Sequence, residues 1–222
     1  MGLIRMKIQA RDLTMGEVAN VFVGLKGGDC MIDWGDGHAS VFQAHPLEVY
    51  PQYESHVYPS KCKKSGDVFD VVICSNEDNI VFLNTGCIDM AILDLDLSDC
   101  PELERLDLTR PVKSLDTQFN KSLKELSIYN AQGISMDLSH NQALEQLELR
   151  GYNNLRLDIS KCDKLWFLDC GDSKIKDIVI SNQSSLKEII FRHRCPLDAN
   201  LKSTAFLCAT MDRNNGCITI VA

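Results

Sequence analysis

The residues of this 222-residue chain best suited to chemistry are its ten cysteines, its five histidines and a group of aspartates near the N-terminus. Asp29, Asp33 and Asp36 could offer carboxylate oxygens to Ca²⁺. Their spacing does not fit an EF-hand loop, however, and no glutamate completes the ligand set. We therefore interpret these aspartates as turn residues that hydrogen-bond the backbone, and we predict no metal site.

The histidines are scattered, and none has a nucleophile at a fixed local spacing. The sequence also lacks a Walker A loop, a dinucleotide fingerprint, an HExxH pair and a GxSxG elbow. We expect His56 to pack or hydrogen-bond near Trp34, His140 to lie solvated on a turn, and His193 to be available to a binding surface. These patterns predict no catalytic residue, no cofactor and no enzymatic activity.

The cysteines form no CxxC pair, which argues against a zinc ribbon or a thioredoxin-like site. We predict that most of them are reduced and buried, because free cysteine packs as a small hydrophobic residue. The net charge of −8 and the absence of a Lys/Arg run argue against binding to nucleic acid. No apolar stretch approaches the roughly 18 residues of a membrane span.

The second half of the chain is periodic, and its period predicts the architecture. Similar segments start at residues 95, 115, 136, 157 and 178, so the spacings are 20, 21, 21 and 21 residues. The first, ninth, twelfth and fourteenth positions are apolar if Cys170 is counted, and the sixth position is Cys, Asn or Gln. Coils of this kind cannot bury their own apolar edge, so they stack and share one core. The sixth residue is expected at a corner, where an inward amide or thiol satisfies backbone groups of its own and the neighbouring coil.

This pattern resembles a bacterial leucine-rich repeat of the internalin type, in which cysteine and asparagine replace each other in ladders. The LxxLxL signature of that family matches, for example, Leu103-Leu106-Leu108 and Leu144-Leu147-Leu149, and the likeness covers roughly residues 88–195. The resemblance implies a solenoid with a parallel β-sheet and a bacterial source. Under this interpretation Cys100, Cys162 and Cys170 belong to the scaffold rather than to a redox or metal site.

The first 87 residues read as a separate β-rich unit with strands such as VANVFVGL, CMIDW and NIVFL. In IDWGDGHASVF, Asp36-Gly37 predicts a hairpin turn with positive φ, and Trp34 is expected to be a buried anchor. The segment resembles a polycystic-kidney-disease-type β-sandwich. The matching residues are the WGDG turn, His56-Val57-Tyr58 and the stretch from Gly66 to Val71, with Phe69 in place of a tyrosine.

The expected fold is therefore mainly β with some α. A leucine-rich-repeat solenoid (88–196) follows an antiparallel β-sandwich-like cap (1–87) and precedes a C-terminal cap (197–222). In the C-terminal cap, apolar spacing from Leu201 to Ala209 predicts a short helix, and CITIV predicts a closing strand.

Outward residues of the expected sheet supply the candidate site. Arginine and aromatic residues, which are enriched at protein interfaces, recur among them. The candidate face comprises Arg105, Asp107, Tyr129, Glu148, Arg150, Phe167, Asp169, Ile190 and Arg192. Phe167 stands out because an exposed phenylalanine beside Trp166 has no benefit for solubility. The alternative interpretation is an ordinary solvated strand face.

These features predict a non-enzymatic recognition module that binds a protein or, less favourably, a glycan, with no nucleic acid and no membrane span. The rival prediction is a structural spacer without a ligand site. The expected compartment is the cytoplasm if Met1 is the native start, and the cell surface or exterior if a signal peptide was removed.

Overall fold

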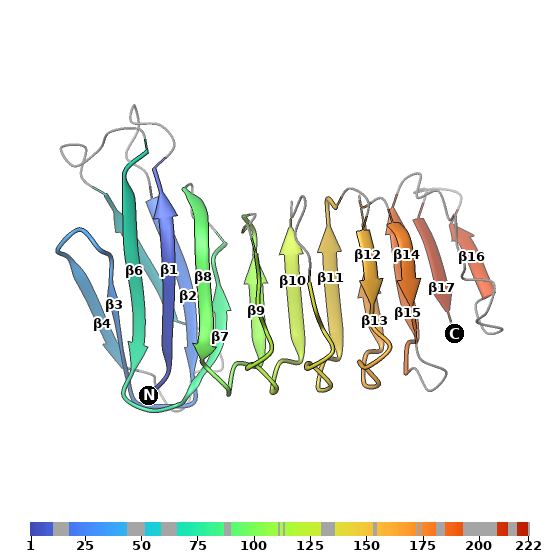
Figure 1. The fold of residues 1–222 in the computed structure, drawn as a ribbon, viewed down its shortest axis with the longest axis horizontal. Coiled ribbons are helices and arrows are strands. Elements are labelled where there is room, and N and C mark those ends of the chain that lie inside the picture. Colours follow the sequence, from blue (N-terminus) through green and yellow to red (C-terminus); the bar gives the residue numbers. More distant parts are fainter. Residues whose placement is uncertain are drawn as a thin grey trace.

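A computed structural model shows an elongated molecule, in which a β-rich N-terminal part is followed by a row of stacked coils (Figure 1). It describes residues 1–10, 18–43, 52–58, 66–86, 90–110, 112, 114–129, 136–152, 155–171, 173, 175–180, 185–192, 208–212 and 217–221. These residues form strands in three sheets.

No helix occurs among the described residues, so the expected α contribution is not seen there. The expected C-terminal helix falls largely on residues 201–207, which lie outside the described residues. Its last two residues, Cys208 and Ala209, belong instead to a strand. The predicted boundaries between the three parts, near residues 87 and 196, also lie outside the described residues.

A five-stranded antiparallel sheet forms one layer of the N-terminal part. Its order is β4 (Ala39–Gln43), β3 (Asp29–Asp33), β6 (Val68–Ser75), β1 (Leu3–Gln9) and β8 (Ala91–Asp99). In β1, Ile4, Met6 and Ile8 are buried while Arg5 and Lys7 are exposed, because neighbouring strand residues point to opposite faces. This alternation places the apolar side chains of β1 in the core.

A second, ten-stranded sheet runs through most of the molecule. It begins with the antiparallel strands β5 (Gln52–Val57), β2 (Val18–Leu25) and β7 (Ile80–Asn84). Strand β7 then pairs in parallel with β9 (Arg105–Leu108), the first strand of the repeats. The N-terminal part and the coils therefore share one continuous sheet and one hydrophobic core.

The repeat strands lie side by side in register, as the sequence predicts. Strand β9 is followed by β10 (Glu125–Tyr129), β11 (Gln146–Arg150), β13 (Phe167–Asp169) and β15 (Glu188–Arg192), all parallel. Leu106, Leu126, Leu147, Leu168 and Ile189 form one buried row across these strands. The predicted stacking of the leucine triplets into one parallel ribbon is confirmed.

Two smaller elements complete the fold. Strands β12 (Leu155–Asp158) and β14 (Ile175–Val179) form a two-stranded parallel sheet. Beyond β15 the long sheet ends in the antiparallel strands β17 (Cys217–Val221) and β16 (Cys208–Asp212).

The corner ladder of asparagine and cysteine is present and acts between coils. The amide nitrogen of Asn120 donates to the carbonyl oxygens of Leu97 (3.0 Å) and Cys100 (2.8 Å). Asn141 repeats the arrangement one coil later, donating to the carbonyls of Thr117 (3.0 Å) and Asn120 (3.1 Å). Each of these carbonyls also accepts a backbone N–H bond within its own coil, so the buried amides add a second hydrogen bond that ties neighbouring coils together.

Cysteine fills the same corner in other coils. The Cys162 thiol donates weakly to the carbonyl of Leu138 at 3.7 Å. Burial raises the pKa of the Cys100 and Cys162 thiols to about 11, which keeps them protonated and poorly nucleophilic. Cys30, Cys74, Cys100 and Cys162 are free thiols, in line with the prediction of reduced cysteines. These properties fit a scaffold role.

A second repeating contact lies on the turn that leads to each corner. The carboxylates of Asp96, Asp116, Asp137 and Asp158 each accept from the backbone nitrogen two residues later, at 2.9–3.0 Å. Such bonds hold the turn before the corner residue.

Candidate functional site

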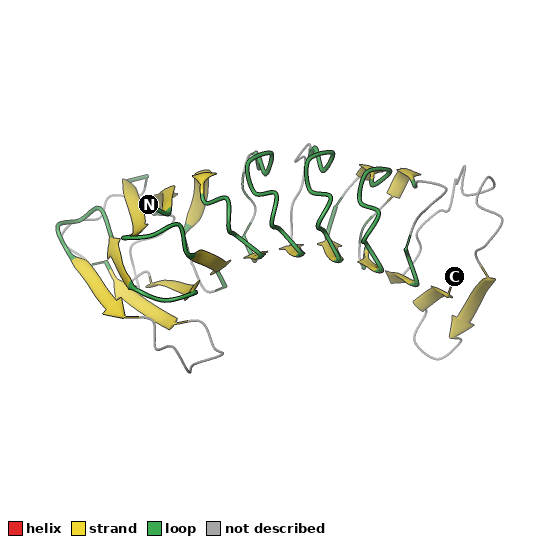
Figure 2. Ribbon diagram, turned by 90° about the horizontal axis from the view of Figure 1, so that it is seen from below, coloured by secondary structure: helices red, strands yellow, loops and turns green. Residues whose placement is uncertain are grey.

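The candidate face is the sheet surface formed by β9, β10, β11, β13 and β15, which line the inner side of a gentle arc (Figure 2). The register places Asp107, Ser127, Glu148, Asp169 and Ile190 in one row across the strands. Arg105, Glu125, Gln146, Phe167 and Glu188 form a parallel row beside it. Both rows follow from the in-register pairing of the repeat strands.

An ionic group, the Arg105 cluster, occupies the end of this face nearest the N-terminal part. Arg105 pairs with Asp107 (Nη2–Oδ2, 2.9 Å) and with Glu125 (Nη1–Oε2, 3.1 Å), and its guanidinium lies 5.2 Å from the ring centre of Phe82. The hydrogen bond to Asp107 is the main cause of the raised pKa of Arg105. Asp107 also accepts from Asn84 Nδ2 at 3.3 Å. Asp107 is therefore a buried partner of Arg105 rather than an exposed contact.

A second group, the Arg150 cluster, lies two coils further along. Arg150 Nη2 contacts Asp169 Oδ2 at 2.5 Å and Glu148 Oε2 at 3.4 Å. The Tyr129 hydroxyl donates to Glu148 Oε2 at 2.8 Å, and the Arg150 guanidinium lies 5.4 Å from the centre of the Tyr129 ring. Burial and the hydrogen bond to Glu148 raise the pKa of Tyr129. Arg150 and Tyr129 are thus held in fixed positions before any partner arrives.

The aromatic residues next to this cluster differ from expectation. Phe167 is half-buried, whereas its neighbour Trp166 is 36% exposed, with ring centres 5.7 Å apart. The tryptophan therefore presents the larger free apolar surface of the pair.

The nine predicted residues fall into three groups. Arg105 is exposed, and Tyr129, Glu148, Arg150, Phe167 and Ile190 are half-buried on the face. Asp107 and Asp169, at 5% and 1% exposure, are buried, which corrects the expectation that they point freely into solvent. The reason is the arginine beside each, which folds over the carboxylate. Arg192 belongs to β15, and its side chain lies outside the described residues.

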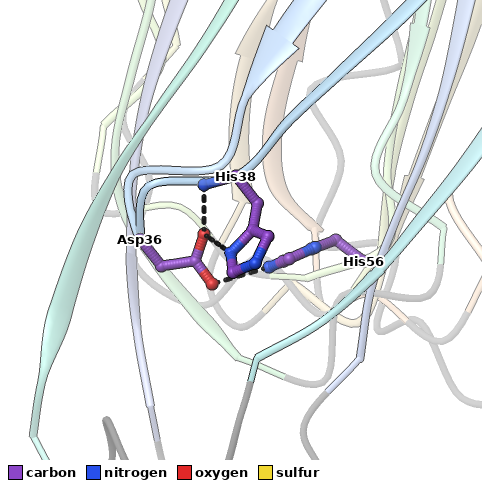
Figure 3. A group of neighbouring side chains, drawn as sticks. All are labelled: Asp36, His38 and His56. Atoms are coloured by element: carbon purple, nitrogen blue, oxygen red, sulfur yellow. Dashed lines mark hydrogen bonds and ion pairs between the residues drawn. The ribbon is translucent and has the colours of Figure 1, made fainter.

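A separate polar group, the hairpin cluster, is formed by Asp36, His38 and His56 in the N-terminal part (Figure 3). Asp36 Oδ2 lies 2.8 Å from His56 Nε2, and Asp36 Oδ1 lies 3.2 Å from His38 Nδ1. The Asp36 side chain is 1% exposed, His56 13% and His38 66%. Burial raises the pKa of the Asp36 carboxyl, but hydrogen bonds from His56 and from the His38 backbone lower it by a larger amount, so the net shift is downward.

The hairpin cluster rests on an aromatic frame. His56 stacks on Trp34 with ring centres 5.1 Å apart and meets the edge of Tyr58 at 4.6 Å, so its predicted packing near Trp34 is confirmed. The Tyr58 hydroxyl donates to the Trp34 carbonyl at 2.9 Å. Gly37 has φ +90°, which confirms the predicted turn. The backbone bonds to Asp33 and Asp36 confirm their roles as turn residues.

The sequence pattern did not bring His38 and His56 together with Asp36. Their separations of two and twenty residues match no metal or catalytic signature. The only available signal was the pairing of a WGDG turn with a later H-x-Y, and that pattern indicated packing.

The fold and its ladders define a β-solenoid with coils of 20 or 21 residues. No protein-family model and no curated protein matches the chain. A solved structure, the functional domain of InlJ from Listeria monocytogenes, which includes a cysteine ladder, is similar in part. The identity is 17%, the TM-score is 0.34, and the match covers 46% of this chain and 29% of that chain.

Within the described residues, no helix is long and apolar enough to cross a membrane.

Proposed function

We propose that this chain is a non-enzymatic, internalin-like recognition module that binds a partner protein through the inner face of its solenoid. The observation that carries the proposal is the unbroken parallel sheet from β7 to β15, which holds outward side chains in registered rows. A rigid surface of this kind loses little conformational entropy when it docks.

The Arg150 cluster is the favoured centre of the binding face. Arginine and tyrosine are enriched among the residues that dominate binding energy, and tryptophan shares this property. Tyr129 and Arg150 are held against each other, and Trp166 and Phe167 add apolar surface next to the cluster. Ion pairs within the cluster fix the side chains, so few rotamers need to be frozen on binding.

Capture of proteins from cell extracts tests the proposal. A triple variant, Tyr129→Ala with Arg150→Ala and Phe167→Ala, is compared with the parent by quantitative mass spectrometry. If the face binds as proposed, partners retained by the parent fall by roughly 30-fold or more, which corresponds to about 2 kcal/mol at a hot spot.

The matched control is Phe119→Ala. Phe119 is 52% exposed and lies beside the corner residue Asn120, away from the sheet face. Partners retained equally by all three proteins would contradict the assignment of this face.

The second candidate function is a structural spacer, which the internally paired charges of the Arg105 and Arg150 clusters would also suit. An absence of any specific partner for the parent protein would favour it. A glycan is the less favoured ligand. If the parent binds a glycan and the triple variant does not, the ligand of this face is a glycan rather than a protein.

The first 87 residues are proposed to be a β-sandwich-like cap of the polycystic-kidney-disease type. The buried Trp34, the tight WGDG turn and the stacking of His56 support this proposal. Proteolysis that releases a folded fragment ending near residue 87 would contradict a cap fused to the coils by a shared sheet.

A further inference from the structure

The hairpin cluster offers a set of metal-binding donors that the proposed recognition function does not use. Two imidazole nitrogens and one carboxylate converge, and the donor atoms of Asp36, His38 and His56 lie within 4.8 Å of one another. Figure 3 shows both rings directed at the carboxylate. Imidazole and carboxylate together suit first-row divalent transition ions better than Ca²⁺ or Mg²⁺, which prefer oxygen ligands.

We propose that Asp36, His38 and His56 bind a divalent transition-metal ion of the Zn²⁺ class in an open, three-ligand site. The 3.2 Å separation between Asp36 Oδ1 and His38 Nδ1 matches neighbouring ligands around such an ion, and the 2.8 Å separation between Asp36 Oδ2 and His56 Nε2 must widen when the ion enters. Bond lengths of about 2.1 Å place cis ligands roughly 3.0–3.4 Å apart.

Two of the three ligands are already in place. The Asp36 side chain is nearly fully buried, and His56 is held between the Trp34 and Tyr58 rings. His38 must rotate to bring the three donor atoms, which lie within 4.8 Å of one another, to binding distance, and its 66% exposure leaves it room to do so. Ordering a single exposed ring costs little conformational entropy, so this cost opposes metal binding only weakly.

The two histidine rings can exchange their hydrogen bonds to Asp36 for bonds to a metal ion. Without a metal ion, the ring nitrogen of each histidine that faces Asp36 can carry a hydrogen and donate it in a hydrogen bond to the carboxylate. A neutral imidazole can move this proton to its other nitrogen, which leaves a lone pair for the ion. The carboxylate then offsets one of the two positive charges.

The position of the site gives it a structural consequence. Asp36 and His38 lie in the turn between β3 and β4, and β4 is an edge strand of the five-stranded sheet. His56 lies in β5, an edge strand of the ten-stranded sheet. An ion bound here joins the edges of both sheets, so it stabilises the N-terminal part and leaves the coils unchanged.

Calorimetric titration of the untagged chain with Zn²⁺ tests the proposal. The parent protein is expected to bind one ion at this site. His38→Ala, which removes an exposed ligand without disturbing the core, is expected to weaken this binding by at least roughly 10-fold. Asp36→Asn keeps the shape of the side chain and removes its charge, and it is expected to weaken binding similarly.

Tryptophan fluorescence locates the ion independently. The chain has two tryptophans, so Trp166→Phe leaves Trp34, stacked on His56, as the sole reporter. Ni²⁺ or Co²⁺ is expected to quench this fluorescence with saturation, and adding His38→Ala is expected to abolish the saturable phase.

His140→Ala is the matched control, because His140 is an exposed histidine on the coils. Its Zn²⁺ titration should equal that of the parent. Equal binding by the parent and His38→Ala, no Zn²⁺ binding by the parent, or tighter binding of Ca²⁺ than of Zn²⁺ would each overturn the proposal. Unfolding temperatures of all variants separate loss of the site from loss of the fold.

Discussion

The coils and the N-terminal part satisfy their buried polar groups in opposite ways. In the coils, Asn120 and Asn141 make the same contacts one coil apart, so each bond has a copy nearby. In the N-terminal part, Trp34, His56 and Tyr58 form a single cluster, which is not repeated among the residues that the structure describes. Stability is therefore distributed along the solenoid and concentrated in the hairpin cluster and its aromatic frame.

The largest test of this contrast removes the centre of the aromatic frame. Trp34 is 1% exposed, and Trp34→Ala is expected to lower the free energy of unfolding by about 3–5 kcal/mol because it leaves a large cavity. Urea unfolding followed by circular dichroism measures the change. Trp166→Ala, at a site 36% exposed, is the control and should cost less than about 1 kcal/mol. Equal losses for the two variants would argue against a concentrated frame.

The corner ladder predicts the next largest effect. Asn141→Ala removes the second hydrogen bond at the carbonyls of Thr117 and Asn120 and the acceptor of the Thr117 hydroxyl. The expected loss in the free energy of unfolding is about 3 kcal/mol, since each of the three lost hydrogen bonds contributes about 1 kcal/mol.

Two variants in the same coil sharpen this measurement. Asn141→Cys should lose less than Asn141→Ala, because Cys162 fills the equivalent corner with a thiol bonded to the Leu138 carbonyl. The exposed neighbour in Gln142→Ala should leave stability unchanged within about 0.5 kcal/mol. A cysteine variant as unstable as the alanine variant would show that the two corner residues are not equivalent.

The difference between the regions also explains what the sequence could predict. The contact between Leu126 and Leu147 has an equivalent between each pair of neighbouring coils. The same apolar spacing therefore occurs in five copies of the repeat, and this repetition indicates the geometry. Strand register, inward leucines and corner amides could all be predicted for this reason.

Contacts that occur only once produce no repeated pattern in the sequence. The meeting of Asp36 and His56 depends on how the β3–β4 turn packs against β5, which no local pattern encodes. The same holds on the sheet face. Alternation correctly placed Asp107 and Asp169 outside the core, but their burial depends on the arginines that cover them. Rotamers of long side chains are set by neighbours in space rather than by the period.

Two glycines of the WGDG turn provide a smaller test. Gly35 has φ +76°, and a Cβ there would lie 2.6 Å from the Asp70 carbonyl oxygen. Gly35→Ala is expected to lower the free energy of unfolding by about 2 kcal/mol, through both strain and overlap. Gly37 has φ +90° and no atom within 4 Å of such a Cβ, so Gly37→Ala should cost about 1 kcal/mol from strain alone. Equal losses for the two variants would mean that β6 shifts enough to accommodate a Cβ at position 35.

The smallest expected effect concerns acid stability of the coils. Hydrogen bonds from Ser139 and Ser160 lower the pKa of Asp137 and Asp158 in the folded state. A carboxyl with a lowered folded pKa contributes stability above its unfolded pKa, near 3.9, and loses it as pH falls through the folded value.

The test is a double variant, Asp137→Asn with Asp158→Asn, in which the side-chain oxygen still accepts the backbone hydrogen bond but no longer titrates. The parent should therefore exceed this variant in unfolding free energy at pH 7, and the gap should narrow as the pH falls to 2. Urea unfolding at both values measures it, and a gap that is the same at pH 2 and pH 7 would show that these turn bonds do not depend on the charge. Because such bonds recur from coil to coil, each one lost should matter less than any single contact of the aromatic frame.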